Sequence, residues 1–159
     1  MNHSVQVGLS FGLTSGVITT IGLMVGVYSG TESSVAVIAS VLTIAIADAM
    51  SDALGIHIAE ESENVHTQRE VWISTLTTFF AKFIVSSTFL IPLLLMDLKT
   101  AVIVNIIWGT LIMVVYNYFV GKRQEQNTWG VIFEHLFIAV LVIIVTYYLG
   151  LWVNHAIVE

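Results

Sequence analysis

The chain of 159 residues is 57% hydrophobic and only 10% charged, with a formal net charge of −6. Because a soluble domain carries roughly 25% charged residues, this composition predicts an integral membrane protein in a lipid bilayer and excludes a sizeable soluble domain. The absence of cysteine excludes disulfides, thiolate metal sites and thiol catalysis. No cluster of Lys and Arg indicates nucleic acid as a partner.

Five apolar stretches are long enough to cross a bilayer, since a spanning helix needs about 20 residues. The first lacks a preceding basic segment and is too long for a cleavable signal, so we expect it to remain in the mature protein. Short connections make consecutive helices antiparallel neighbours. The predicted fold is one all-α transmembrane domain over residues 1–159, with spans at residues 5–28, 34–59, 71–96, 100–120 and 129–153.

The few positive charges predict how the helices cross the membrane. Arg69, Lys122 and Arg123 lie in the second-to-third and fourth-to-fifth connections, on the side of the N-terminus, whereas the other side has Lys99. Because cytoplasmic loops carry the excess of Lys and Arg, we expect a cytoplasmic N-terminus and a C-terminus outside or in a lumen. A small five-span chain is compatible with a prokaryotic inner membrane.

The first span carries glycines at four-residue spacing, Gly8, Gly12 and Gly16, with serines and threonines between them. Small residues at this spacing allow two helix backbones to approach closely. We therefore predict that these glycines form the contact face of a two-fold homodimer. The hydroxyl-rich composition of the same helix favours a position that lines a path or a dimer seam.

The second span contains two aspartates, Asp48 and Asp52, in an otherwise apolar stretch. A carboxylate near the bilayer centre costs roughly 2.5 to 3.5 kcal/mol on insertion scales, so an intramembrane acid is a functional hypothesis by default. The pair predicts a path for a cation or a proton. The alternative is a structural role, with each aspartate neutralised by a basic or hydroxyl partner in the bundle.

A second helix that continues through the acidic segment after this span places Asp48 and Asp52 on one stripe, about 120° wide, with Glu63 and His66. We predict that the two aspartates hold a metal cation and that Glu63 and His66 form its cytoplasmic approach. Glu60 is expected at the level of the headgroups, where it either concentrates cations or repels anionic lipid.

Lys82 is the one basic residue at membrane depth, level with Asp48 when both are counted from the cytoplasmic ends of their spans. An unpaired ammonium there is costly, so we predict an ion pair between Lys82 and Asp48 or Asp52, either structural or a switch that a metal breaks. Glu134 and His135 lie near the depth of Asp52 in the fifth span. They either complete a site with it or form a solvated helix end.

Several segments resemble the signatures of one family. Residues 8–14 (GLSFGLT), and residues 49–55 (AMSDALG) followed by residues 61–63 (ESE), are similar to those of the vacuolar iron transporter family, which includes the yeast Ca2+-sensitive cross-complementer iron and manganese carriers. Pro92 and residues 147–150 (YYLG) are also similar. The resemblance implies a five-helix protomer, a dimer with a path at its interface lined by the first two helices, and export of Fe2+ or Mn2+ from the cytosol in exchange for protons.

The chain departs from the family pattern at its acidic positions. Phe11 stands where the family usually has an aspartate, Ile44 falls near an upstream family glutamate, and Asp52 occupies the position of a methionine. The cytoplasmic metal-binding domain of the family is reduced here to the acidic stretch at residues 60–70. The resemblance therefore indicates a divergent branch without that domain, with acids relocated onto the second helix.

The residue types predict a transporter of divalent metal cations rather than an enzyme. Carboxylate and imidazole ligands suit Fe2+, Mn2+ and similar ions, and a metal that binds carboxylates at membrane depth should release protons. We expect the metal as transported substrate, with no permanently bound cofactor. The alternative is a non-transporting membrane scaffold or accessory subunit. No HExxH motif is present, and His57, Glu60 and Glu61 lack the second histidine of an inverted zinc motif.

Overall fold

The structure is a computed structural model that describes the chain from His3 to Arg123 and from Asn127 to Val158. The regular elements of these two stretches are all helical: α1 His3–Thr31, α2 Ser34–Thr43, η1 Ile44–Asp48, α3 Ala49–Ser62, α4 Gln68–Thr88, α5 Leu90–Leu95, α6 Leu98–Arg123 and α7 Thr128–Val158. They form five rods that are long and apolar enough to cross a membrane, in which α2, η1 and α3 make one rod and α4 and α5 another. The predicted all-α fold, with five helices long and apolar enough to span a membrane, is confirmed.

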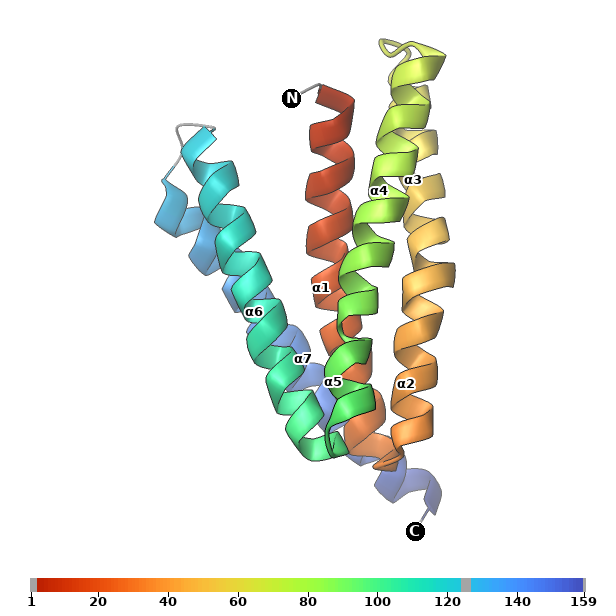
Figure 1. The fold of residues 1–159 in the computed structure, drawn as a ribbon, viewed down its shortest axis with the longest axis vertical. Helices are drawn as coiled ribbons and strands as arrows, with labels where there is room; N and C mark the ends of the chain where they lie inside the picture. Colours follow the sequence, from red (N-terminus) through yellow and green to blue (C-terminus); the bar gives the residue numbers. More distant parts are fainter. Residues whose placement is uncertain (1–2, 124–126, 159) are drawn as a thin grey trace.

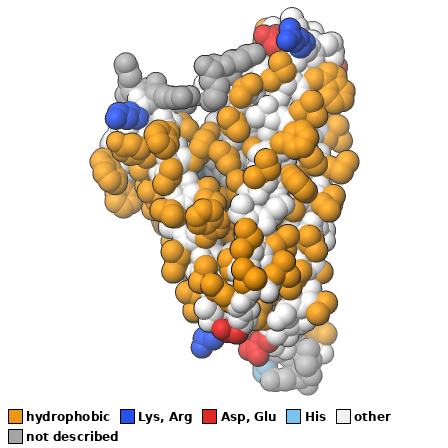
Figure 2. All heavy atoms as spheres, in the orientation of Figure 1, with side chains coloured by type: hydrophobic (Ala, Val, Ile, Leu, Met, Phe, Trp, Pro, Cys, Tyr) orange, Lys and Arg blue, Asp and Glu red, His pale blue; other side chains and the backbone are white. Residues whose placement is uncertain are grey.

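Helix α1 is the central rod (Figure 1), in contact with α4 and α7 along much of its length and with α2, α3 and α6 over shorter stretches. It begins at the same end as the connection between α3 and α4, which we call the N-terminal end of the bundle. The opposite, C-terminal end holds the turn between α1 and α2 and the end of α7. Hydrophobic side chains cover the length of the face in Figure 2, and charged side chains lie at its two ends, as a bilayer requires.

The glycines in the first half of α1 pack against α4 of the same chain. A Cβ atom on Gly8 would lie 2.6 Å from the carbonyl oxygen of Ser74, and one on Gly12 would lie 2.6 Å from that of Thr78. All three glycines, Gly16 included, are buried. The prediction that they form the contact face of a homodimer is therefore wrong, because a helix of the same chain already covers that face.

The glycines in the second half of α1 pack closely against α7, as those in the first half pack against α4. A Cβ on Gly22 would lie 2.7 Å from Cγ1 of Val142, and one on Gly30 would lie 3.2 Å from the carbonyl oxygen of Gly150. Gly26 packs between them, against the same helix. Small residues allow close approach of backbones. The glycines of α1 therefore pack against α4 in its first half and against α7 in its second half.

The acidic segment after the second span is not the predicted helical extension. Helix α3 ends at Ser62, and Asn64 has a φ of 58°, a left-handed conformation that turns the chain. Helix α4 then begins with a capping box, in which Thr67 and Glu70 satisfy each other's backbone N–H groups. The helix stops because Asn64 tolerates the left-handed turn and the capping box starts a new helix immediately after it.

The third span bends between α4 and α5. Pro92 has no N–H group for the carbonyl of Thr88, four residues earlier, which ends α4 at that residue. Beside the bend, the side-chain amide of Asn105 in α6 donates a hydrogen bond of 2.9 Å to the carbonyl of Phe89. The bend is thus fixed to the fourth span by a buried polar contact.

Candidate cation site

The predicted ion pair is present, and it involves both aspartates. The ammonium of Lys82 lies 2.5 Å from Oδ2 of Asp48 and 2.5 Å from Oδ2 of Asp52. The hydroxyl of Ser15 donates to Asp52 at 2.6 Å and accepts from Lys82 at 3.0 Å. Three spans therefore meet at one charged cluster, which we call the triad of Asp48, Asp52 and Lys82.

A local change of helix type positions the aspartates. The second rod contains a π-helical turn, η1, in which the N–H of Ala49 reaches the carbonyl of Ile44, five residues back. Asp48 is the last residue of this turn, and Asp52 lies in the first turn of α3. Single π-helical turns are rare and are frequently found at functional sites.

A glycine makes room for the lysine. A Cβ on Gly16 would lie 3.3 Å from Cγ of Lys82, so the lysine stem lies directly on the backbone of α1. This packing leaves Lys82 with no exposed surface, and its charged end points between the two aspartates.

The triad carries more negative than positive charge. Two ionised carboxylates and one ammonium leave a formal charge of −1, at side chains that are 0% exposed for Lys82, 19% for Asp52 and 38% for Asp48. Asp52 has the ammonium and the Ser15 hydroxyl as partners, whereas Asp48 has the ammonium and one exposed side. Asp48 is thus the more accessible end of the triad.

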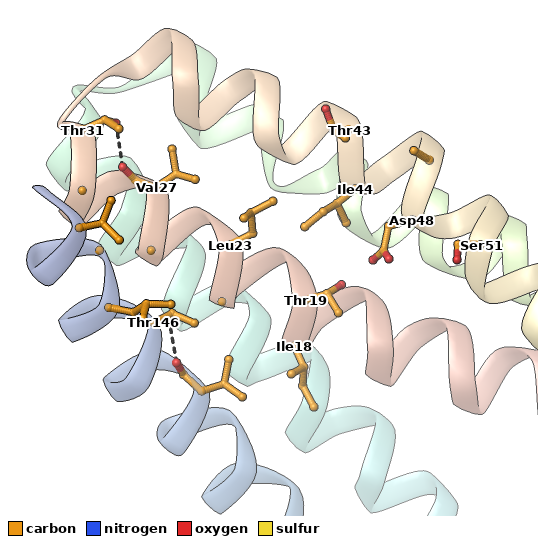
Figure 3. A pocket seen from close by; sticks show the side chains of 18 residues that line it. Ile18, Thr19, Leu23, Val27, Thr31, Thr43, Ile44, Asp48, Ser51 and Thr146 are labelled. Atoms are coloured by element: carbon orange, nitrogen blue, oxygen red, sulfur yellow. Dashed lines mark hydrogen bonds between the residues drawn. The ribbon is translucent and has the colours of Figure 1, made fainter. Parts of the chain in front are cut away.

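A large cavity opens beside Asp48. It has a volume of about 990 Å³ and lies between α1, the second rod and α7. Its walls are mainly apolar, and the hydroxyls of Thr19 and Ser51 lie near Asp48 at one end. Figure 3 shows the Asp48 carboxylate pointing into the space between η1 and α1, and the cavity extending from there toward Thr31. We call it the C-terminal cavity.

A second hollow lies on the other side of the triad. It has a volume of about 640 Å³ and is lined by α1 from His3 to Thr14, by Ile56 of α3 and by His135 of α7. Thr14 precedes Ser15, and Ile56 is one helical turn from Asp52. This N-terminal hollow and the C-terminal cavity therefore approach the triad from opposite ends of the bundle.

The predicted approach residues lie together at the N-terminal end, but for a different reason than the predicted stripe. His66 is in the connection between α3 and α4, and its Nε2 lies 3.2 Å from Oε2 of Glu63 and 3.8 Å from Oε2 of Glu60. The turn after α3, rather than a continuous helix, brings them together. The ring of His3 stacks on that of His66, with centroids 5.7 Å apart.

Glu134 and His135 make no hydrogen bond or ion pair with Asp52 in the described parts of the chain. Glu134 is exposed, and the Nδ1 of His135 bonds the carbonyl of Val131, one turn back on the same helix, at 2.8 Å. His135 contributes only a wall of the N-terminal hollow. The geometry therefore fits the prediction that Glu134 and His135 form a solvated helix end, and does not fit a site shared with Asp52.

Residues 8–12 (GLSFG) have the Gly-x-Ser-x-Gly spacing of a hydrolase nucleophile, and the structure places them inside a continuous helix. The motif requires a sharp turn from a strand to a helix that exposes the serine. Here the hydroxyl of Ser10 accepts a hydrogen bond of 2.6 Å from that of Tyr116. The spacing therefore belongs to the packing of α1, with its glycines against α4.

Comparisons of the chain with protein-family models, with curated proteins and with solved structures found no match.

Two residues of these sites were not among the predicted ones. Ser15 was one hydroxyl among many in the first span, and only the register of α1 against α4 selects it. His3 precedes the apolar part of α1, and it meets His66 because the chain returns to the N-terminal end after α3. Only the predicted antiparallel order of the helices indicated that His3 and His66 lie at the same end of the bundle.

Proposed function

We propose that the chain is a carrier of divalent metal cations, of the Fe2+ and Mn2+ class, that exchanges the metal for protons across the membrane. The observation that supports this most is the charge of the triad, in which two carboxylates share one buried ammonium. A purely structural pair needs only one carboxylate. Because net charge at membrane depth is costly, the second carboxylate calls for another positive charge, either a proton or a cation.

Charge balance defines the exchange. With Lys82 protonated, the triad is neutral when it holds one additional proton. With a divalent cation on Asp48 and Asp52, it is neutral when that proton and the ammonium proton of Lys82 have both left. One metal ion therefore replaces two protons, and Lys82 occupies the carboxylates while the metal is absent.

We infer that the two hollows are the routes by which ions reach the triad, the C-terminal cavity at Asp48 itself and the N-terminal hollow from the level of Thr14 and Ile56. With the orientation expected from the positive charges, the N-terminal hollow faces the cytoplasm, and the metal leaves through the C-terminal cavity. A homodimer remains part of the proposal, with its contact away from the α1 glycines. Within one chain most of the apolar surface of α7 is uncovered, which leaves that helix free for such a contact.

Liposomes that contain the protein, a metal-sensitive dye and a pH dye test the proposal. We expect wild-type protein to take up Mn2+ or Fe2+ with counterflow of protons, in a ratio near two protons per metal. Asp52→Asn and Asp48→Asn keep the shape but remove the charge, so both fluxes should fall to the level of protein-free liposomes. Asp97→Asn is the matched control, because Asp97 caps α6 outside the spans and Asn caps helices equally well.

Unchanged metal flux in both aspartate variants would exclude the triad as the site. Absence of uptake of either metal by correctly folded wild-type protein would contradict the carrier and favour a membrane scaffold. Metal uptake without proton counterflow would leave a carrier but remove the exchange.

A further inference from the structure

Three potential metal ligands converge at the N-terminal end of the bundle, outside the triad. A nitrogen of His3, a carboxylate oxygen of Glu60 and a nitrogen of His66 all lie within 4.8 Å of one another. They come from the first turn of α1, the last turn of α3 and the connection to α4. Residues that are distant in sequence are thus brought to one point by the fold.

Glu60 supplies an independent indication of a ligand. The residue is only 6% exposed, and its Oε2 is buried without a hydrogen-bond partner among the described residues. Nε2 of His66 is 3.8 Å away, outside hydrogen-bonding distance. Since buried carboxylate oxygens are normally bonded, this oxygen is placed to receive a cation that also contacts the two imidazoles.

We propose that His3, Glu60 and His66 bind one divalent transition-metal ion, of the class of Zn2+ and Co2+, and that Glu63 or water supplies the fourth ligand. Two imidazoles and a carboxylate suit these ions, whereas Mg2+ and Ca2+ prefer sites made of oxygen alone. Bonds of about 2.0 to 2.1 Å in a tetrahedral site place the donor atoms roughly 3.3 Å apart. Rotation of the exposed His3 side chain closes the remaining distance.

Metal at this point would connect two parts of the bundle. His3 also lines the N-terminal hollow, so the bound ion lies on the rim of that hollow and ties the start of α1 to the end of α3. Glu63 now accepts from Nε2 of His66 at 3.2 Å, and metal binding would exchange this contact for a bond to the ion. The site requires no transport activity and holds or fails independently of the triad.

The test is a titration of tag-free protein in detergent with Co2+, followed by visible absorption and thermal unfolding. We expect one Co2+ per chain at His3, Glu60 and His66, in addition to any Co2+ that the triad binds, with a spectrum of mixed nitrogen and oxygen ligation and a higher melting temperature when Co2+ is present. His3→Ala, Glu60→Gln and His66→Ala should each raise the Kd at least tenfold and remove the Co2+-induced rise. Glu61→Gln removes a neighbouring exposed charge and should leave both readouts unchanged.

The same titration on Asp52→Asn separates this site from the triad. The Co2+ spectrum and the thermal shift should persist in that variant, even where metal flux is lost. The proposal is overturned if wild-type protein shows no saturable Co2+ spectrum, or if His3→Ala and His66→Ala bind Co2+ as the wild type does. Circular dichroism of each variant verifies that the helices are intact.

Discussion

Lys82→Met is expected to lower the stability of the bundle by roughly 3 to 5 kcal/mol, the usual cost of removing one partner of a buried ion pair. Methionine keeps much of the stem that packs on Gly16, so the main change is the loss of charge. Asp48 and Asp52 then face each other across the triad without the ammonium that lies 2.5 Å from both. Thermal unfolding in detergent, followed by tryptophan fluorescence, measures the loss.

A second substitution tests whether the unbalanced charge at the triad causes the loss of stability. Lys82→Met combined with Asp52→Asn has the same formal charge at the triad as the wild type, so it should recover part of the lost stability. Recovery with Asp48→Asn should be smaller, because Asp48 is more exposed than Asp52. Lys99→Met, at an exposed position, serves as the control. Equal melting temperatures for Lys82→Met and Lys99→Met would show that the triad does not stabilise the fold.

Gly12→Ala is expected to destabilise the bundle by forcing α1 and α4 apart. The new methyl group would lie 2.6 Å from the carbonyl oxygen of Thr78 and 2.8 Å from Cβ of Ala81, and backbone atoms cannot move aside as a flexible side chain does. Overpacking of this kind costs typically about 1 to 3 kcal/mol, occasionally more. Thermal unfolding of the purified variant measures the effect.

Gly55→Ala is the matched control, since a Cβ there meets nothing within 4 Å. Alanine is the better helix former by roughly 0.8 to 1.0 kcal/mol, so this variant should be as stable as the wild type or more so. If Gly12→Ala left stability unchanged but dissociated an oligomer, the glycine face would belong to a second copy after all. Size-exclusion chromatography with light scattering distinguishes the two results.

The spans and the ion pair could be predicted because each follows from the cost of exposing a group to lipid. Long apolar stretches must cross the membrane, and a lysine at the depth of Asp48 must find a carboxylate. The contact of Gly12 with α4 could not be predicted, because small residues at regular spacing permit close approach without specifying which helix approaches. A second chain and a neighbouring helix satisfy the same pattern equally well.

The position of His66 was mispredicted for a local reason. The polar stripe assumed one uninterrupted α-helix from Asp48 onward, and the turn at Asn64 ends that helix. Equally, nothing in the composition of residues 44–48 distinguishes a π-helical turn from an α-helical one. Asp48 and Asp52 share a face because they are four residues apart at the start of α3, so their depth and common face were predictable and the π-helical turn in front of α3 was not.

The π-helical turn that ends at Asp48 holds one more residue than an α-helical turn. If the carbonyls of η1 moved their bonds to partners four residues ahead, the helix would lose its extra residue. One residue of an α-helix corresponds to about 100° of rotation around the axis. Because Asp48 ends this turn and Asp52 follows in α3, such a shift would rotate both carboxylates together relative to α2 and to Lys82 on the neighbouring rod.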